Sequence, residues 1–329
     1  MLDGLLIIDK PSGPTSHDVV ARMRRVLGET RIGHTGTLDP LATGVLLLVI
    51  GKATRLAKFL SASDKSYDAV IRLGFATDTA DVQGRPLGPV SERSMPSRGE
   101  IDAALDAFRG TFMQQPPAFS AKKIGGQRSY KLARAAARLK PSRYESDASD
   151  LPAPPAHPGP PAPPALPAPV SVTAHAIRVV SVDGDRVTLS VDCSAGFYIR
   201  SLAHDLGERL GIGAHLTALR RTQTGAFTLD QAVTLDTVER APQRAAAALL
   251  PLASILPGLP SVILTTEGIS RVAHGQDIHP HDQLSTLSAQ PTAAGPQPFF
   301  RLLDRDGNLV AVAEPTDAGG VLHPSVVLM

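Results

Sequence analysis

The sequence contains no tryptophan, only four tyrosines and a single cysteine, Cys193. One cysteine cannot form a disulfide within the chain, and no group of cysteines and histidines has the spacing of a zinc site. No apolar run approaches the about 20 residues that a membrane-spanning helix needs. The apolar N-terminal segment lacks a basic flank and is broken at Asp9. We therefore expect a metal-free cytoplasmic protein with neither a signal peptide nor a membrane anchor.

Acidic residues are absent from residues 120–144, although the whole chain is nearly neutral with a formal net charge of +2. Residues 1–150 contain 22 lysines and arginines against 16 acidic residues, so positive charge is concentrated in the first half. Such a run indicates either a phosphate-binding surface or a solvated helix face. Its basic residues are Lys122, Lys123, Arg128, Lys131, Arg134, Arg138, Lys140 and Arg143.

Hydrophobic periodicity predicts a mixture of helices and strands, with ten prolines in residues 151–170 marking an exposed, extended insertion. The predicted strands are 4–9, 44–50, 67–75, 172–182, 186–193, 299–303 and 309–313. The predicted helices are 101–108, 130–139, 199–210 and one that begins after Thr15 or Ser16 and closes at Gly28. Asp183-Gly184 predicts a hairpin, and the polar stretch 281–298 predicts a long loop. The length allows one large domain, 1–255, followed by a small β-rich domain, 256–329.

The densest cluster of glycines surrounds one carboxylate, Asp39, in the segment GHTGTLDPLATG that starts at Gly33. Glycines at this density allow a backbone to approach another molecule closely. The segment has neither the phosphate-loop pattern nor the dinucleotide-binding pattern, and no second carboxylate in comparable context suggests a glycosidase. By its local chemistry Asp39 could equally be a turn residue before Pro40. Tyr67, Tyr198 and Arg200 are further candidates for contacts with a nucleic-acid base or phosphate.

Taken together, these segments resemble the TruB family of tRNA pseudouridine synthases over nearly the whole chain. The resemblance rests on an ordered series of motifs: KPSGPTS from Lys10, GHTGTLDPLATGVL from Gly33, KSYDAVIRLG from Lys65, QPPAFSAKK from Gln115, CSAGFYIR from Cys193 and LRRT from Leu219. The stretch 135–169 departs from the family, because the proline- and alanine-rich insertion replaces a short connector.

The resemblance implies an α+β fold of the pseudouridine synthase type, with a mixed, largely antiparallel sheet and a small C-terminal β-rich domain similar to PUA. The first domain would carry a thumb-like RNA-binding segment at about 115–140, followed by the insertion at about 141–170. The implied substrate is the T-stem-loop of tRNA, and the implied target is the T-loop uridine conventionally numbered 55, which must be flipped out of its stack. The family needs no cofactor and no obligatory protein partner, and we expect a monomer.

The resemblance also implies a role for each matching residue. Asp39 would be the catalytic carboxylate, Arg200 its ionic partner and Tyr67 the platform that stacks on the flipped uracil. The other implied residues line or support the site: His34 would fill the space left by the base, Tyr198 and Leu219 would line the uracil pocket, and Lys10 and Pro11 would support the catalytic loop. The thumb would bind the RNA backbone through Lys122, Lys123, Arg128, Lys131 and Arg134.

Two other functions compete with a stand-alone enzyme. One is a dyskerin-like catalytic subunit that depends on a guide RNA and partner proteins; the thumb-like segment 115–134 argues against it, since guide-dependent relatives lack an equivalent. The other is a non-catalytic RNA-binding or RNA-folding protein, against which the joint presence of Asp39, Tyr67 and Arg200 counts.

Overall fold

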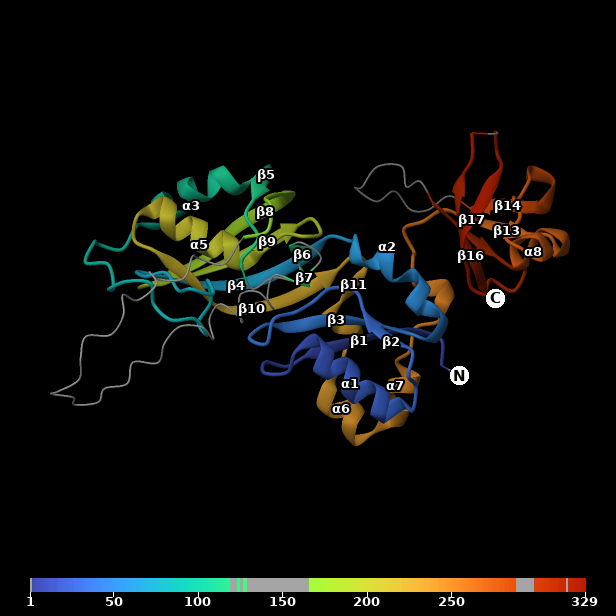
Figure 1. Ribbon diagram of the computed structural model, residues 1–329, viewed down its shortest axis with the longest axis horizontal. Coiled ribbons are helices and arrows are strands. Elements are labelled where there is room, and N and C mark those ends of the chain that lie inside the picture. Colours follow the sequence, from blue (N-terminus) through green and yellow to red (C-terminus); the bar gives the residue numbers. More distant parts are fainter. Residues whose placement is uncertain (1, 119–122, 125–126, 129–165, 288–298, 318) are drawn as a thin grey trace, which may run out of the picture. The chain divides into compact units, whose positions relative to one another are not determined.

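The computed structural model describes residues 2–118, 123–124, 127–128, 166–287, 299–317 and 319–329 (Figure 1). The chain forms two compact units, one made of Met1–Asp68 with Leu219–Met329 and the other of Ala69–Ala218. Some predictions fall outside the described residues: the helix 130–139, most of the Pro/Ala-rich insertion, and Lys122, Lys131 and Arg134. The division into domains 1–255 and 256–329 stays a prediction.

The first unit contains part of a mixed sheet built around one apolar strand. Its strands are β1 (Gly4–Lys10), β2 (Ile32–His34), β3 (Thr43–Ile50), β11 (Phe227–Thr228), β12 (Val233–Thr234) and β10 (Ala214–Thr224), which continues into the second unit. β3 is buried along all but its first residue, as expected of an apolar strand covered on both faces. It pairs antiparallel with β1 and β2 and parallel with β10, where Arg221 lies opposite Gly44. These pairings bring the residues on either side of Asp39 into the sheet.

Three helices of the first unit lie beside the β1–β3 pair (Figure 1). They are α1 (Ser16–Leu27), α6 (Leu235–Arg240) and α7 (Pro242–Ala247). Further helical segments of this unit before residue 255 are α2 (Ala57–Ser61), η1 (Gly51–Leu56), η3 (Leu229–Gln231) and η4 (Leu252–Ser254). α1 begins with a capping box in which the Thr15 hydroxyl accepts from the Asp18 N–H at 3.1 Å and the Asp18 carboxylate accepts from the Thr15 N–H at 2.8 Å. The prediction of a cap at Thr15 or Ser16 and an end at Gly28 is confirmed, with Thr15 as the capping residue.

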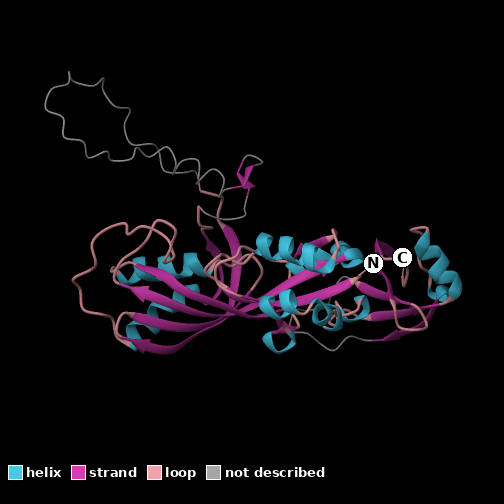
Figure 2. Ribbon diagram, turned by 90° about the horizontal axis from the view of Figure 1, so that it is seen from below, coloured by secondary structure: helices cyan, strands magenta, loops and turns pink. Residues whose placement is uncertain are grey.

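The second unit contains the remaining strands of the mixed sheet in the order β10-β4-β9-β8-β5. Its strands are β4 (Lys65–Leu73), which begins in the first unit, β5 (Gly110–Gln114), β8 (Val170–Asp183), β9 (Arg186–Cys193) and a separate short pair, β6 (Lys123–Ile124) with β7 (Gln127–Arg128). Its helices are α3 (Arg98–Leu105), η2 (Asp106–Phe108) and α5 (Ile199–Leu210). The predicted hairpin is confirmed, since Asp183 pairs with Arg186 around Gly184. Figure 2, which colours helices and strands differently, shows the α+β class that the sequence predicted.

A second sheet lies near the C-terminus, in the order β14-β13-β15-β16-β17. Its elements are β13 (Ser261–Leu264), α8 (Thr266–Ala273), η5 (Pro280–Asp282), β14 (Gln283–Leu287), β15 (Phe300–Leu303), β16 (Leu309–Pro315) and β17 (Leu322–Val327). The β-rich character predicted for this region is confirmed. The predicted loop 281–298 is wrong over residues 283–287, which form the edge strand β14 paired with β13. The polar residues of β14 conceal it, because the pairing partner and not local propensity decides such a strand.

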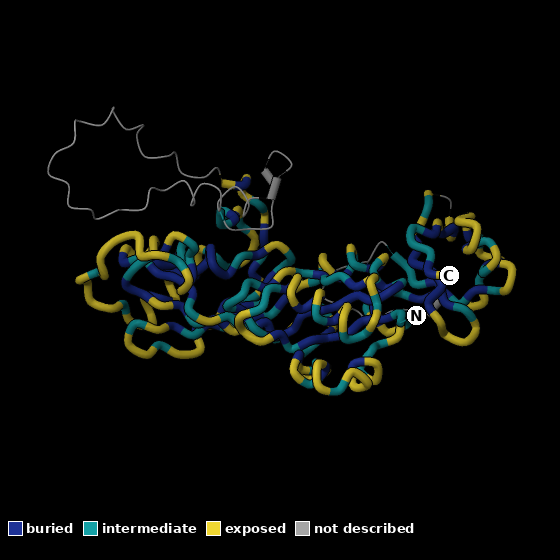
Figure 3. The backbone as a smooth tube through the Cα atoms, turned by 60° about the horizontal axis from the view of Figure 1, so that its bottom comes forward, coloured by how far each residue is buried: buried dark blue, intermediate teal, exposed yellow. Residues whose placement is uncertain are grey.

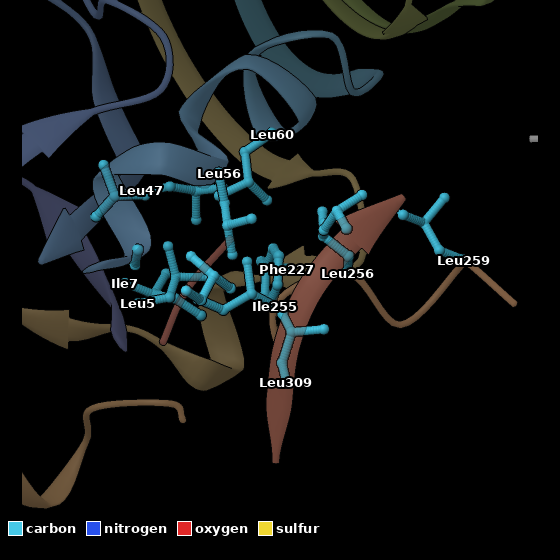
Figure 4. Packing of buried hydrophobic residues seen from close by; sticks show 14 of the residues in the cluster. Leu5, Ile7, Leu47, Leu56, Leu60, Phe227, Ile255, Leu256, Leu259 and Leu309 are labelled. Atoms are coloured by element: carbon cyan, nitrogen blue, oxygen red, sulfur yellow. The ribbon is translucent and has the colours of Figure 1, made fainter. Parts of the chain in front are cut away.

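The C-terminal sheet shares a hydrophobic core with the N-terminal strands (Figure 4). Leu309 and Val312 of β16 join Leu5 and Ile7 of β1 in one cluster of buried side chains, and each of the four is at most 4% exposed. The cluster also contains Val45, Leu47, Val49, Leu56, Leu60, Phe227, Ile255, Leu256, Leu259, Leu303 and Leu328. Within the first unit, β16 is therefore packed against side chains of β1 and β3 and not only against its own sheet.

Burial follows the regular elements, while exposed residues collect on loops and turns (Figure 3). Among the described residues no helix has the length and apolarity to cross a bilayer. In the same part of the chain no group of three or more His, Cys, Asp or Glu residues is placed to hold a metal ion.

Candidate active site

The loop that carries Asp39 connects two neighbouring antiparallel strands, β2 and β3. It leaves the sheet after His34, which lies opposite Leu48, and the Thr35 N–H donates to the Leu47 carbonyl at 3.2 Å. The loop closes with a turn in which the Ala42 N–H donates to the Asp39 carbonyl at 3.0 Å. Asp39 is half-buried at this turn. Both ends of the loop are therefore fixed by strands, and the turn fixes the backbone position of Asp39.

Ser16 anchors the loop directly before Asp39. Its hydroxyl accepts from the Leu38 N–H at 2.8 Å and donates to the Leu38 carbonyl at 3.2 Å. Ser16 is fully buried and Leu38 is 3% exposed, so this double hydrogen bond is shielded from water. Ser16, the last residue of the KPSGPTS motif, thus supports the loop from the first turn of α1.

Lys10, predicted to support the same loop, is fully buried at the end of β1. Its ammonium donates to the carbonyls of Pro11 and Pro14, each at 2.8 Å, and to that of Pro40 at 3.5 Å. The Pro40 carbonyl also accepts from the Gly13 N–H at 2.8 Å. Burial lowers the pKa of Lys10 to about 8, an effect that the charge of Asp39 opposes and that of Arg221 reinforces. Lys10 therefore lies within electrostatic reach of the Asp39 carboxylate.

The lowered pKa of Lys10 is expected to make stability depend on pH in the alkaline range. Between about pH 8, the pKa of Lys10 in the folded chain, and pH 10.5, its ordinary pKa, the unfolded chain binds more protons than the folded chain. The free energy of unfolding therefore rises with pH in this range. Relative to Lys10→Met, the wild type should gain stability between pH 8 and 10.5, and the difference should be constant below pH 7. Urea titrations at a series of pH values measure it. Lys52→Met, which removes a half-exposed lysine, is the control; a wild-type profile parallel to that of Lys10→Met would contradict the expectation.

The other predicted residues of the first unit lie on the strands around this loop. Tyr67 lies on β4 and is 8% exposed, while Leu219 is half-buried on β10, where its carbonyl accepts from the Thr43 hydroxyl at 3.4 Å. His34 is half-buried, and its Nδ1 accepts from the Gly36 N–H at 3.5 Å. The rings of His17 and His34 are T-shaped to one another, with 5.0 Å between their centroids. The first unit thus carries Lys10, Pro11, His34, Asp39, Tyr67 and Leu219.

In the second unit, Arg200 lies buried in the first turn of α5 and is 5% exposed. Its Nη1 donates to the Thr79 carbonyl at 3.2 Å and lies 3.9 Å from the Asp81 carboxylate, which is also buried. Asp81 is not among the residues that the sequence motifs predict for the site. A signal was available in the short polar segment 77–81, where the Thr79 hydroxyl donates to Asp81 at 2.6 Å. The predicted pairing of Arg200 with Asp39 stays a prediction.

Tyr198 and the described residues of the predicted thumb belong to the second unit as well. Tyr198 precedes α5, and its backbone N–H and carbonyl bond the side chain of the buried Gln114 at 2.8 and 3.0 Å. Within the segment predicted to be the thumb, β6 and β7 pair antiparallel with the backbone of Lys123 opposite that of Arg128.

Comparisons with known proteins agree with the motifs. The family model described as "TruB family pseudouridylate synthase (N terminal domain)" matches residues 24–148, and that described as "tRNA pseudouridylate synthase B C-terminal domain" matches residues 200–257. Proteins named tRNA pseudouridine synthase B are similar over nearly the full chain. One from Solibacter usitatus is 39% identical and one from Thermobifida fusca 40%, with 99% of this chain and at least 99% of theirs covered. One from Ralstonia nicotianae is 41% identical, with 98% of this chain and 92% of its own covered.

Solved structures show the same fold. The crystal structure of a Cbf5-Nop10-Gar1 complex contains a chain 26% identical to this one, with a TM-score of 0.68 over 99% of this chain and 85% of that one. A structure of an H/ACA RNP bound to a substrate RNA containing 2′-deoxyuridine gives the same TM-score at 24% identity, and the same two shares are covered.

Proposed function

The chain belongs to the TruB family of pseudouridylate synthases, and we propose from this that it converts uridine 55 in the T loop of tRNA into pseudouridine. The observation that carries the proposal is the similarity, over almost the entire chain, to proteins named tRNA pseudouridine synthase B. The rigid support of the loop around Asp39 agrees with it, because chemistry on a positioned base needs a preorganised group.

In the proposed reaction Asp39 is the catalytic carboxylate. The N1–C1′ bond of the uridine breaks, the uracil turns, and a C5–C1′ bond forms. C5 then loses its proton while N1 gains one, so the product is an isomer of the substrate. The change involves no net oxidation or reduction, and we propose that no cofactor or metal takes part.

The remaining residues would bind and orient the base. The uridine must leave its stack, which costs a few kcal/mol, and contacts in the site offset this cost. His34 would fill the space that it leaves, Tyr67 would stack on the uracil, and Tyr198 and Leu219 would line its pocket. Arg200 would pair with Asp39 and favour its charged form. Lys10 and Pro11 would hold the loop, and the basic thumb residues would bind phosphates.

We further propose that residues 1–255 form the catalytic domain and 256–329 a PUA-like RNA-binding domain, and that the protein works in the cytoplasm as a monomer without an obligatory partner. A guide-dependent subunit is the second candidate, since the similar solved structures include the Cbf5-Nop10-Gar1 complex and the H/ACA RNP. A third candidate, an RNA-binding protein without turnover, would bind tRNA and leave it unchanged.

One experiment separates these functions. The purified chain alone is expected to release tritium from tRNA labelled at uridine C5, with an end point of one tritium per tRNA labelled at position 55, and to act on an isolated T-stem-loop. Activity that requires a guide RNA and partner proteins would favour the second candidate. Saturable tRNA binding without any release would favour the third, and a tRNA with cytidine at position 55 is the substrate control.

A further inference from the structure

Arg221, which follows Leu219 by two residues, is a buried cation that donates hydrogen bonds to the Asp39 loop at Gly36 and to strand β3 at Val45. It lies on β10 and is 2% exposed. Its Nε donates to the Val45 carbonyl at 2.7 Å, and its Nη2 donates to the Gly36 carbonyl at 3.2 Å. Gly36 precedes Asp39 by three residues and Val45 follows it by six, so one planar guanidinium ties the two sides of the loop together.

Two glycines allow the loop to lie this close to Arg221. At Gly44, where β3 and β10 pair, the backbone has φ of 100°, and a Cβ would collide with the carbonyl oxygen of Arg221. At Gly36, φ is 144°, and a Cβ would lie 3.6 Å from Nη1 of Arg221. Both values favour glycine, so the GHTGTLDPLATG segment is shaped to rest on this arginine.

Arg221 and Asp39 both exert an electrostatic influence on the buried Lys10. A buried guanidinium is costly unless hydrogen bonds and nearby charges compensate for its lost hydration. Arg221 is compensated by hydrogen bonds to the Gly36 carbonyl of the loop and the Val45 carbonyl of β3. Lys65, which is 8% exposed, also lies near Gly36, where a Cβ would be 3.9 Å from its Cε. Its ammonium donates to the Ser61 carbonyl at 3.0 Å. The side of the loop that faces the protein interior is therefore lined by cations.

We infer that Arg221 is a positioning residue of the proposed pseudouridylation reaction: it clamps the Gly36 and Val45 carbonyls and so fixes the place of the Asp39 carboxylate. The expected loss of kcat rests on the proposed function. The clamp itself does not, because hydrogen exchange can measure it in the free protein. A clamp of this kind acts on the chemical step more than on binding, since it adds no contact with the RNA.

The test compares Arg221→Gln and Arg221→Lys with Arg24→Gln in the full chain. Arg24 is the matched control, because this exposed arginine of α1 also donates to a backbone carbonyl, that of Ile32, at 2.8 Å, but outside the loop. For Arg221→Gln we expect kcat for tritium release to fall about 100-fold with KM nearly unchanged, as for a slight displacement of a catalytic group. Arg221→Lys keeps the charge but not the fork and should lose about tenfold. Arg24→Gln should behave as the wild type.

Hydrogen exchange supplies the second readout. The amides of Leu38 and Ala42 donate to the Ser16 hydroxyl and to the Asp39 carbonyl, respectively. Both should exchange at least about tenfold faster in Arg221→Gln than in the wild type or Arg24→Gln. A folded Arg221→Gln with wild-type kcat, or with wild-type exchange at these amides, would overturn the inference. So would activity lost only in proportion to the unfolded fraction. If Arg221→Gln does not fold, the same two measurements are made on Arg221→Lys. Wild-type kcat and wild-type exchange in that variant would overturn the inference. A wild type that releases no tritium would refute the proposed function, while exchange still decides on the clamp.

Discussion

Replacement of Asp39 by asparagine is expected to abolish tritium release from C5-labelled tRNA while tRNA affinity stays close to that of the wild type. Asparagine has nearly the same shape and keeps the turn in which the Asp39 carbonyl accepts from Ala42. It lacks the negative charge and the nucleophilic and basic properties of a carboxylate. Removing a group that takes part in bond changes typically lowers kcat by about 10⁴-fold or more. Single-turnover tritium release and filter binding on the same preparation measure both quantities.

Asp18→Asn is the matched control for this substitution. It removes the same charge from a residue that also influences the pKa of Lys10, but Asp18 lies at the exposed start of α1. Its pKa is lowered by hydrogen bonds from Thr15, so the variant tests the loss of a capping carboxylate and not of a catalytic one. Activity in Asp18→Asn with none in Asp39→Asn supports the proposed role. Joint loss of binding, folding and activity in Asp39→Asn would make Asp39 a structural turn residue instead.

Removal of the C-terminal sheet is expected to destabilise the N-terminal strands severely. A chain that ends at residue 259 lacks Leu303, Leu309, Val312 and Leu328, each buried in the cluster that also contains Leu5 and Ile7. Burial of one side chain of this size contributes about 1.5–3 kcal/mol, so losing four approaches the about 5–15 kcal/mol of a whole domain. The shortened chain should precipitate or unfold at much lower urea than the full chain, as circular dichroism would show.

Point variants distinguish a shared core from the simple loss of a neighbouring domain. Leu309→Ala should lower the free energy of unfolding by about 2–5 kcal/mol and keep a single transition, because the cavity opens in a core to which both sheets contribute. Leu284→Ala, in the same C-terminal sheet but 49% exposed, should change it little. Two separate transitions, of which Leu309→Ala shifts only one, would show that the two sheets unfold independently.

Local signals in the sequence were sufficient for much of the secondary structure. The capping residue Thr15, the terminal Gly28 and the apolar period between them determine α1, and Asp183-Gly184 determines the β8–β9 hairpin. β10 and β14 were not predicted, although both are ordinary strands of their sheets. Their sequences alternate poorly, and they are strands because partners distant in the chain pair with them.

The candidate site divides in the same way. The sequence alone determined which residue types stand in the Asp39 loop, and the ordered motifs were sufficient to indicate the family, because both are properties of the chain read in order. Only the tertiary structure revealed what holds that loop: Ser16 on Leu38, Lys10 on Pro40, and Arg221 on Gly36 and Val45. The same holds for Asp81 beside Arg200 and for the core shared with the C-terminal sheet. Ser16 and Leu38 are 22 positions apart in the chain, and Arg221 and Gly36 are 185 positions apart. Burial and hydrogen-bond pairing over such separations arise only when the whole chain is packed, so no local pattern encodes them.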